Sequence, residues 1–69
     1  MNKQEIRAKY GCAVGDTVYR VGDITTLGEV RWVDLTRQGV TQVEVLWDGS
    51  WDTEIVLSST LRRATMQFA

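Results

Sequence analysis

The sequence contains no histidine and no proline, and Cys12 is its only cysteine. A single cysteine cannot form an intrachain disulfide, and one thiolate without histidine cannot complete a structural zinc site. A catalytic thiol also needs a base or a positive environment to form its thiolate, so Cys12 is expected to be an inert, small apolar residue. The residue types therefore predict no catalytic residue, no metal ligand and no cofactor.

The sequence also has no marked excess of either positive or negative charge. The chain has 8 basic and 9 acidic residues, which are interspersed, and its net charge is −1. No block of basic residues indicates a nucleic-acid-binding tail, so nucleic acid is the less favoured partner. No apolar run is long enough for a signal peptide or a membrane helix, and one unpaired cysteine suits a reducing compartment. These features predict a cytoplasmic protein without a membrane partner.

The chain is short, with 69 residues in one domain. A domain of this size buries only about 60% of the surface that its unfolded chain exposes. Such domains usually need disulfides, metal or association with further copies. Since the first two are excluded, the length favours an efficient β core, a homo-oligomer, or both.

Residues 1–11 predict a short helix. Asn2 followed by Glu5 resembles a capping box, and Gly11 is suited to end the helix. Ile6 and Tyr10 lie four residues apart and share one face. A helix this short does not hold in water unaided, so it is expected to dock on the rest of the chain through these two side chains.

From Val14 onward the apolar period changes to two, which indicates strands. Strands are expected at 15–21, 29–34, 41–47, 51–57 and 62–65, with a loop at 21–28, a turn at 35–40 and a serine-capped helical turn at 58–61. In the third strand Val43, Val45 and Trp47 are expected to face inward, against Gln42, Glu44 and Leu46 outward. Trp32 is expected to follow Val30 inward. Residues 12–65 thus predict one small barrel, followed by a tail at 66–69.

The segments "VGDTVYR", "GEVRWV", "VEVLWDG" and "IVLSSTLRRA" resemble the outline of SH3-like barrels such as Tudor-like and KOW-like domains. The resemblance covers residues 14–65 and implies an all-β fold. The expected architecture is an SH3-like five-stranded small barrel with a short N-terminal helix and a single-turn helix before the last strand. This architecture hosts many unrelated functions, so it implies no particular activity.

A weaker resemblance links "VGDTVYR", "GEVRWV" and "TEIVLSSTLRRA" to the plasmid-encoded type II dihydrofolate reductases, which are short SH3-like chains that assemble as tetramers around a pore. That family lines its pore with a Gln-Ile-Tyr run and a lysine, where this chain has residues 54–56 and Arg20. An ionised Glu54 only accepts hydrogen bonds, and Val56 lacks the aromatic hydroxyl. The resemblance therefore implies the assembly rather than the reaction.

The stretch "VLWDGSWDTEIV" contains two tryptophans around an Asp-Gly turn. Trp47 ends the inward row and is expected in the core, whereas Trp51 is placed equally well in the core or at an interface or pocket rim. An aromatic cage for a cationic group is one use of such residues. The candidate ligand or partner surface consists of Tyr19, Asp48, Trp51, Asp52, Glu54, Ile55 and Val56. Which of residues 54–56 face inward is left open, because one bulge would exchange them.

Exposed apolar residues provide a second candidate surface, an interface formed by Leu46, Met66 and Phe68. Our leading hypothesis is a non-enzymatic, self-associating module that binds a protein or a small-molecule ligand. The alternative is an oligomeric pore-type enzyme, related to the type II reductases, with altered chemistry. The second alternative is a nucleic-acid-binding module, for which the candidate residues are Arg20, Arg31, Arg37, Arg62 and Arg63.

Overall fold

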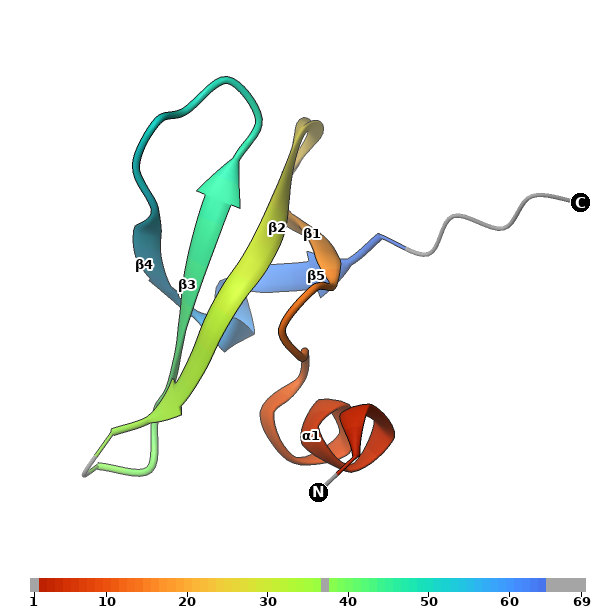
Figure 1. Cartoon of the computed structure of the whole chain (residues 1–69), viewed down its shortest axis with the longest axis vertical. Coiled ribbons are helices and arrows are strands. Elements are labelled where there is room, and N and C mark those ends of the chain that lie inside the picture. The colour runs from red at the N-terminus through yellow and green to blue at the C-terminus, as the bar shows by residue number, and fades with distance from the viewer. Residues whose placement is uncertain (1, 37, 65–69) are drawn as a thin grey trace, which may run out of the picture.

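The computed structural model describes residues 2–36 and 38–64. Five strands form one antiparallel sheet in the order β4-β3-β2-β1-β5 (Figure 1). The elements are α1 Lys3–Tyr10, β1 Thr17–Arg20, β2 Asp23–Leu35, β3 Thr41–Trp47, β4 Glu54–Leu57, the 3-10 turn η1 Ser58–Thr60 and β5 Leu61–Arg63. The predicted all-β class, with a helix at the N-terminus and one helical turn before the last strand, is confirmed.

The long central strand β2 gives the sheet its curvature. It has 13 residues and pairs with β1 along its first part and with β3 along its second. The register to β3 shifts between Val30 and Trp32, so Arg31 is an extra residue in a β-bulge. Bulges bend a strand and increase its twist. In Figure 1 the last strand β5 crosses the direction of β2 and β3, and the curved sheet thus encloses its inner face.

The predicted loop at 21–28 is wrong, because β2 begins at Asp23. Arg20 pairs directly with Asp23, which leaves only Val21 and Gly22 for the turn. Gly22 has φ 88°, a value that glycine adopts without steric cost. The following run of β-branched residues, 24–26, favours extended backbone and continues the strand.

The inner face of the sheet forms the core. Val18, Val30, Val43 and Val45 are 0% exposed, and Trp47 is 5% exposed. The predicted inward row of β3 is therefore confirmed. Cys12 and Leu61 complete this buried cluster.

The predicted inward position of Trp32 is wrong, since its side chain is 61% exposed. The bulge at Arg31 is the physical reason. Because Arg31 is the extra residue beside the Trp32–Glu44 pair, the alternation of β2 shifts by one residue. The next inward residue after Val30 is therefore Val33 rather than Trp32. Trp32 consequently stands on the outer face of the sheet.

The predicted caps of α1 are confirmed. The Asn2 side chain accepts a hydrogen bond from the Glu5 N–H, and Gly11 ends the helix with φ 93°. Ile6 and Tyr10, through which α1 is predicted to dock, are half-buried, and no residue of α1 is fully buried. Figure 1 shows α1 beside the strands rather than over the sheet.

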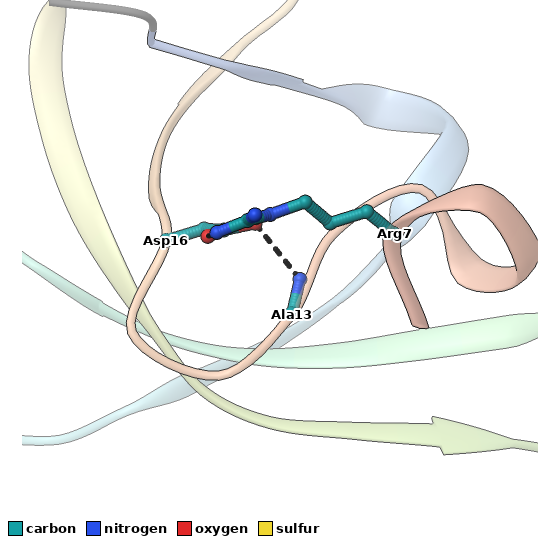
Figure 2. A network of polar contacts seen from close by, with 3 residues as sticks. All are labelled: Arg7, Ala13 and Asp16. Atoms are coloured by element: carbon teal, nitrogen blue, oxygen red, sulfur yellow. Dashed lines mark hydrogen bonds and ion pairs between the residues drawn. The ribbon is translucent and has the colours of Figure 1, made fainter. Parts of the chain in front are cut away.

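An ion pair connects α1 to the turn that precedes β1 (Figure 2). Arg7 Nη2 lies 2.5 Å from Asp16 Oδ1, and Arg7 Nε donates to Oδ2 at 2.9 Å. The Ala13 N–H also donates to Asp16 Oδ2, at 2.9 Å. Planar guanidinium and carboxylate groups that meet in this way fix direction as well as distance.

The C-terminal part follows the prediction with three corrections. The expected returning strand 51–57 begins only at Glu54. No serine side chain caps η1, and Thr60 Oγ1 instead donates to the Leu57 carbonyl at 2.7 Å. The last strand is Leu61–Arg63 rather than 62–65. The predicted tail 66–69, with Met66 and Phe68, lies outside the described residues.

Candidate functional site

The structure resolves how the three predicted surface residues of β4 are oriented. Val56 pairs with the buried Val43 and packs against the core, so it faces inward. Glu54 lies two residues earlier and shares that inner face, at the end of the strand. Ile55 lies on the opposite face and is 65% exposed. The predicted run therefore divides between two sides of the sheet.

The other predicted surface residues lie outside β4. Asp48, Trp51 and Asp52 lie in the connection between β3 and β4, where all three are exposed and Trp51 is 98% exposed. Tyr19 is half-buried on β1, where it pairs with Arg62 of β5. Two strands separate β1 from β4 in the sheet order. The residues of the predicted surface thus come from β1, from the connection between β3 and β4, and from β4.

Arg20 links two of these strands across the inner face. Its guanidinium carbon lies 4.3 Å from the centre of the Trp47 ring, and its Nη2 lies 2.5 Å from Glu54 Oε1. The cation therefore stacks on a buried indole and pairs with a carboxylate at the same time. Trp47 Nε1 is buried without a hydrogen-bond partner among the described residues. This arrangement pairs the charges of Arg20 and Glu54 with each other.

The outer face of β2, β3 and β4 carries a row of three paired residues, Trp32, Glu44 and Ile55. A small cavity of about 80 Å³ opens there, which we call the outer pocket. Its lining residues are Trp32, Asp34, Gln42, Glu44 and Ile55. Neither carboxylate has an ion-pair partner within residues 2–36 and 38–64, although Thr53 donates a hydrogen bond to Glu44. The pocket thus combines apolar walls with two carboxylates that form no ion pair with the described residues.

A second cavity of about 390 Å³ lies between α1 and β2, and we call it the helix crevice. Its lining residues are Lys3, Ile6, Tyr10, Ala13, Val14, Trp32 and Val33. All but Lys3 present apolar or aromatic surface. The indole of Trp32 borders both cavities, so the two share one wall.

Cys12 offers no reactive thiol. Burial raises the pKa of the Cys12 thiol, and the charge of Asp16 raises it further. A raised pKa keeps the group protonated at neutral pH, and the thiol is a poor nucleophile in that state. The place of Cys12 in the buried cluster agrees with the prediction of an inert, small apolar residue.

Two further properties concern the described residues alone. No group of three or more histidine, cysteine, aspartate or glutamate side chains there is placed to hold a metal ion. No helix in this part of the chain is long and apolar enough to cross a membrane.

Strict alternation after Val30 predicts an inward Trp32, whereas the bulge places it on the outer face. A signal for the bulge is present in "EVRWVDL", where Val30 and Val33 are three residues apart instead of two. Two apolar β-branched residues at this spacing are compatible with one inner face only if a bulge lies between them.

We compared the chain with protein-family models, with curated proteins and with solved structures, and none of them matches it. The likeness to SH3-like barrels and to the type II reductases therefore stays a prediction.

Proposed function

We propose that the protein is a non-enzymatic interaction module that binds a protein partner on the outer face of β2, β3 and β4. The observation that carries this proposal is the outer pocket, in which the 61% exposed Trp32 stands beside Asp34 and Glu44. A large exposed aromatic side chain is a typical interface anchor. Two carboxylates beside it favour a partner with a basic side chain.

The size and chemistry of the outer pocket support this partner. A volume of about 80 Å³ fits the end of one side chain rather than a separate small molecule. The aliphatic stem of a lysine or arginine would lie against Trp32 and Ile55, and its charge would meet the ring face and the carboxylates. The contribution of one such cation–π contact is about 0.5–2 kcal/mol, depending on its exposure.

The outer face is not suited to pairing with the same face of a second copy. No described residue in the row or the pocket is basic, so two copies packed face to face would bring Asp34 and Glu44 together with their counterparts. Like charges across an interface suppress association. Charge complementarity therefore favours a different, basic surface at this site.

The test is fluorescence anisotropy with a labelled peptide of alternating lysine and leucine, and with a second peptide in which glutamate replaces lysine. We expect the lysine peptide alone to bind, and Glu44→Gln to weaken it about threefold to fivefold, the loss of one partly exposed ionic contact. Trp32→Ala should weaken it further. Glu29→Gln is the matched control, because Glu29 is an exposed glutamate of β2 that pairs with Arg31. Equal binding of the two peptides would contradict the proposal.

Self-association is a second proposal, supported by the free edge of the sheet at β4. This edge strand carries the exposed Ile55 and Leu57, and the fully exposed Trp51 precedes it. Open edges with apolar side chains readily pair with further strands. Light scattering on a sizing column should show a concentration-dependent oligomer that Trp51→Ser weakens, while Val21→Ser, at an exposed apolar residue in the turn between β1 and β2, leaves it intact. A monomer at every concentration would rule self-association out.

The Arg20–Glu54 pair supports the non-enzymatic proposal over the pore-type enzyme. Each group satisfies the other, whereas a cofactor-binding pore needs charges free to meet its phosphates. A nicotinamide cofactor added to concentrated protein should leave its fluorescence unchanged, and a saturable change would favour the enzyme. Nucleic acid is tested by salt-dependent binding of short single strands and duplexes, which we expect to be absent.

A further inference from the structure

We propose that the helix crevice is a binding site for a small organic anion with an apolar body, such as a medium-chain or aromatic carboxylate. The site is separate from the outer pocket, apart from the shared wall at Trp32. The proposal therefore does not depend on a protein partner at the outer face.

The volume and the lining of the crevice fit such a ligand. Its volume of about 390 Å³ falls within the range of roughly 300–1,000 Å³ in which small-molecule sites occur. Ile6 and Tyr10 of α1 form one wall, and Trp32 and Val33 of β2 form the other. Sites of this kind are mostly apolar with a few polar groups that orient the ligand.

The crevice is bounded by elements that are fixed to one another. The Arg7–Asp16 ion pair holds α1, and Asp16 is in turn anchored because the Val30 N–H donates to its carbonyl at 2.9 Å. The Gly15 N–H donates to the Val30 carbonyl at 2.8 Å. Two hydrogen bonds thus join the turn between α1 and β1 to Val30 of β2. The two walls of the crevice keep their spacing without a ligand, which lowers the cost of binding.

The charge at the crevice favours a ligand with a negative charge. Lys3 is the one charged residue of the lining, and its Nζ lies 3.4 Å from the position that a Cβ on Gly15 would take. Its ammonium group has no ion-pair partner within the described residues. Lys9 lies outside the lining, and its Nζ lies 5.5 Å from the centre of the Tyr10 ring. A ligand whose apolar body enters between the two walls would therefore place an anionic group at Lys3.

The test is a titration of the 69-residue chain with octanoate, octylamine and octanol, three probes with the same chain length and different charge. Two-dimensional NMR of backbone amides gives both the affinity and the location. We expect octanoate to shift the amides of Ile6, Tyr10, Val14 and Val33 in a saturable way. Octylamine should not do so, and octanol should bind more weakly than octanoate.

Two matched variants separate a specific contact from bulk charge. Lys3→Gln and Lys9→Gln remove the same charge from the same helix, but only Lys3 lines the crevice. We expect Lys3→Gln to weaken octanoate about fivefold, which is the effect of one partly exposed ion pair, and Lys9→Gln to leave the affinity nearly unchanged. Equal binding of the three probes, equal weakening by the two variants, or no saturable shift with octanoate would each overturn the proposal.

Discussion

The sheet and the helix of this protein are held in place by different forces. In the sheet, four valines and a tryptophan are withdrawn from water, and burial of such side chains stabilises a fold by about 1.5–3 kcal/mol each. The helix α1 buries none of its residues and is attached through Arg7 and Asp16. Apolar burial is insensitive to pH, whereas an ion pair is lost when its acid becomes protonated. The two parts are therefore expected to respond to different perturbations.

The largest effect is expected from Trp47→Ala, which attacks the sheet. Truncation of a buried tryptophan costs about 3–5 kcal/mol, and the core of a domain this small rarely supplies more than about 3–5 kcal/mol in total. The variant should therefore be largely unfolded, sheet and helix together. Far-UV circular dichroism with urea titration measures this. A folded sheet in the variant would show that Trp47 is not essential to the core.

A smaller loss is expected from Gly28→Ala, which tests how closely the sheet is packed. A Cβ on Gly28 would lie 2.5 Å from Val45 Cγ1 and 2.7 Å from Trp47 Cε3. Both neighbours are buried and have little room to move, so overpacking should cost about 1–3 kcal/mol. Glu29→Ala at the adjacent exposed residue is the control and should change the free energy of unfolding by less than about 0.5 kcal/mol. Equal effects of the two variants would contradict this account of the packing.

The attachment of α1 should respond to acid before the sheet does. Hydrogen bonds from Arg7 lower the pKa of Asp16, and the Ala13 N–H adds to this effect, while burial of the carboxylate opposes it. Because the folded pKa lies below the ordinary value of about 3.9, the stabilisation is complete above that pH and is lost as the pH falls through the folded pKa.

This difference is measured by amide hydrogen exchange in α1 and in β3 between neutral and acidic pH, corrected for the intrinsic exchange rate. Protection in α1 should fall first. In Asp16→Asn the protection of α1 should be weak already at neutral pH and change little with acid. Loss of protection in α1 and β3 at the same pH would mean that the ion pair and the core form one cooperative unit.

The smallest effect is expected from Trp51→Ala. This side chain is 98% exposed, so its truncation should change the free energy of unfolding by less than about 0.5 kcal/mol. Compared with Trp47→Ala in the same urea titration, it separates two tryptophans that are four positions apart in the sequence. Marked destabilisation would place Trp51 in contact with the folded chain.

Features set by local signals were predictable from the sequence. The caps of α1 at Asn2 and Gly11, the inward row of β3 and the turn before Leu61 each depend on residues a few positions apart. Local physical chemistry decides them, through capping, alternation and tight-turn geometry. They account for the order of the elements and for most of the core.

Features that depend on pairing between distant segments were not predictable in the same way. The bulge at Arg31 is defined by the register between β2 and β3, and it moved Trp32 from the expected core to the outer face. The ion pair of Arg7 and Asp16 joins residues nine positions apart with no repeating pattern. Both candidate cavities depend on these two features, so the site was harder to predict than the fold.

The bulge also bears on how this chain tolerates changes in length. The pairs Val30 with Val45 and Trp32 with Glu44 are in register on either side of Arg31, and Arg31 itself is the surplus residue. Deletion of Arg31 would leave every inward side chain of β2 inward and every outward one outward. Deletion of Trp32 would likewise keep the register but place an arginine opposite Glu44 and remove the common wall of the two cavities. A family of natural or designed length variants at this point would therefore share one core while differing in what their outer surface can bind.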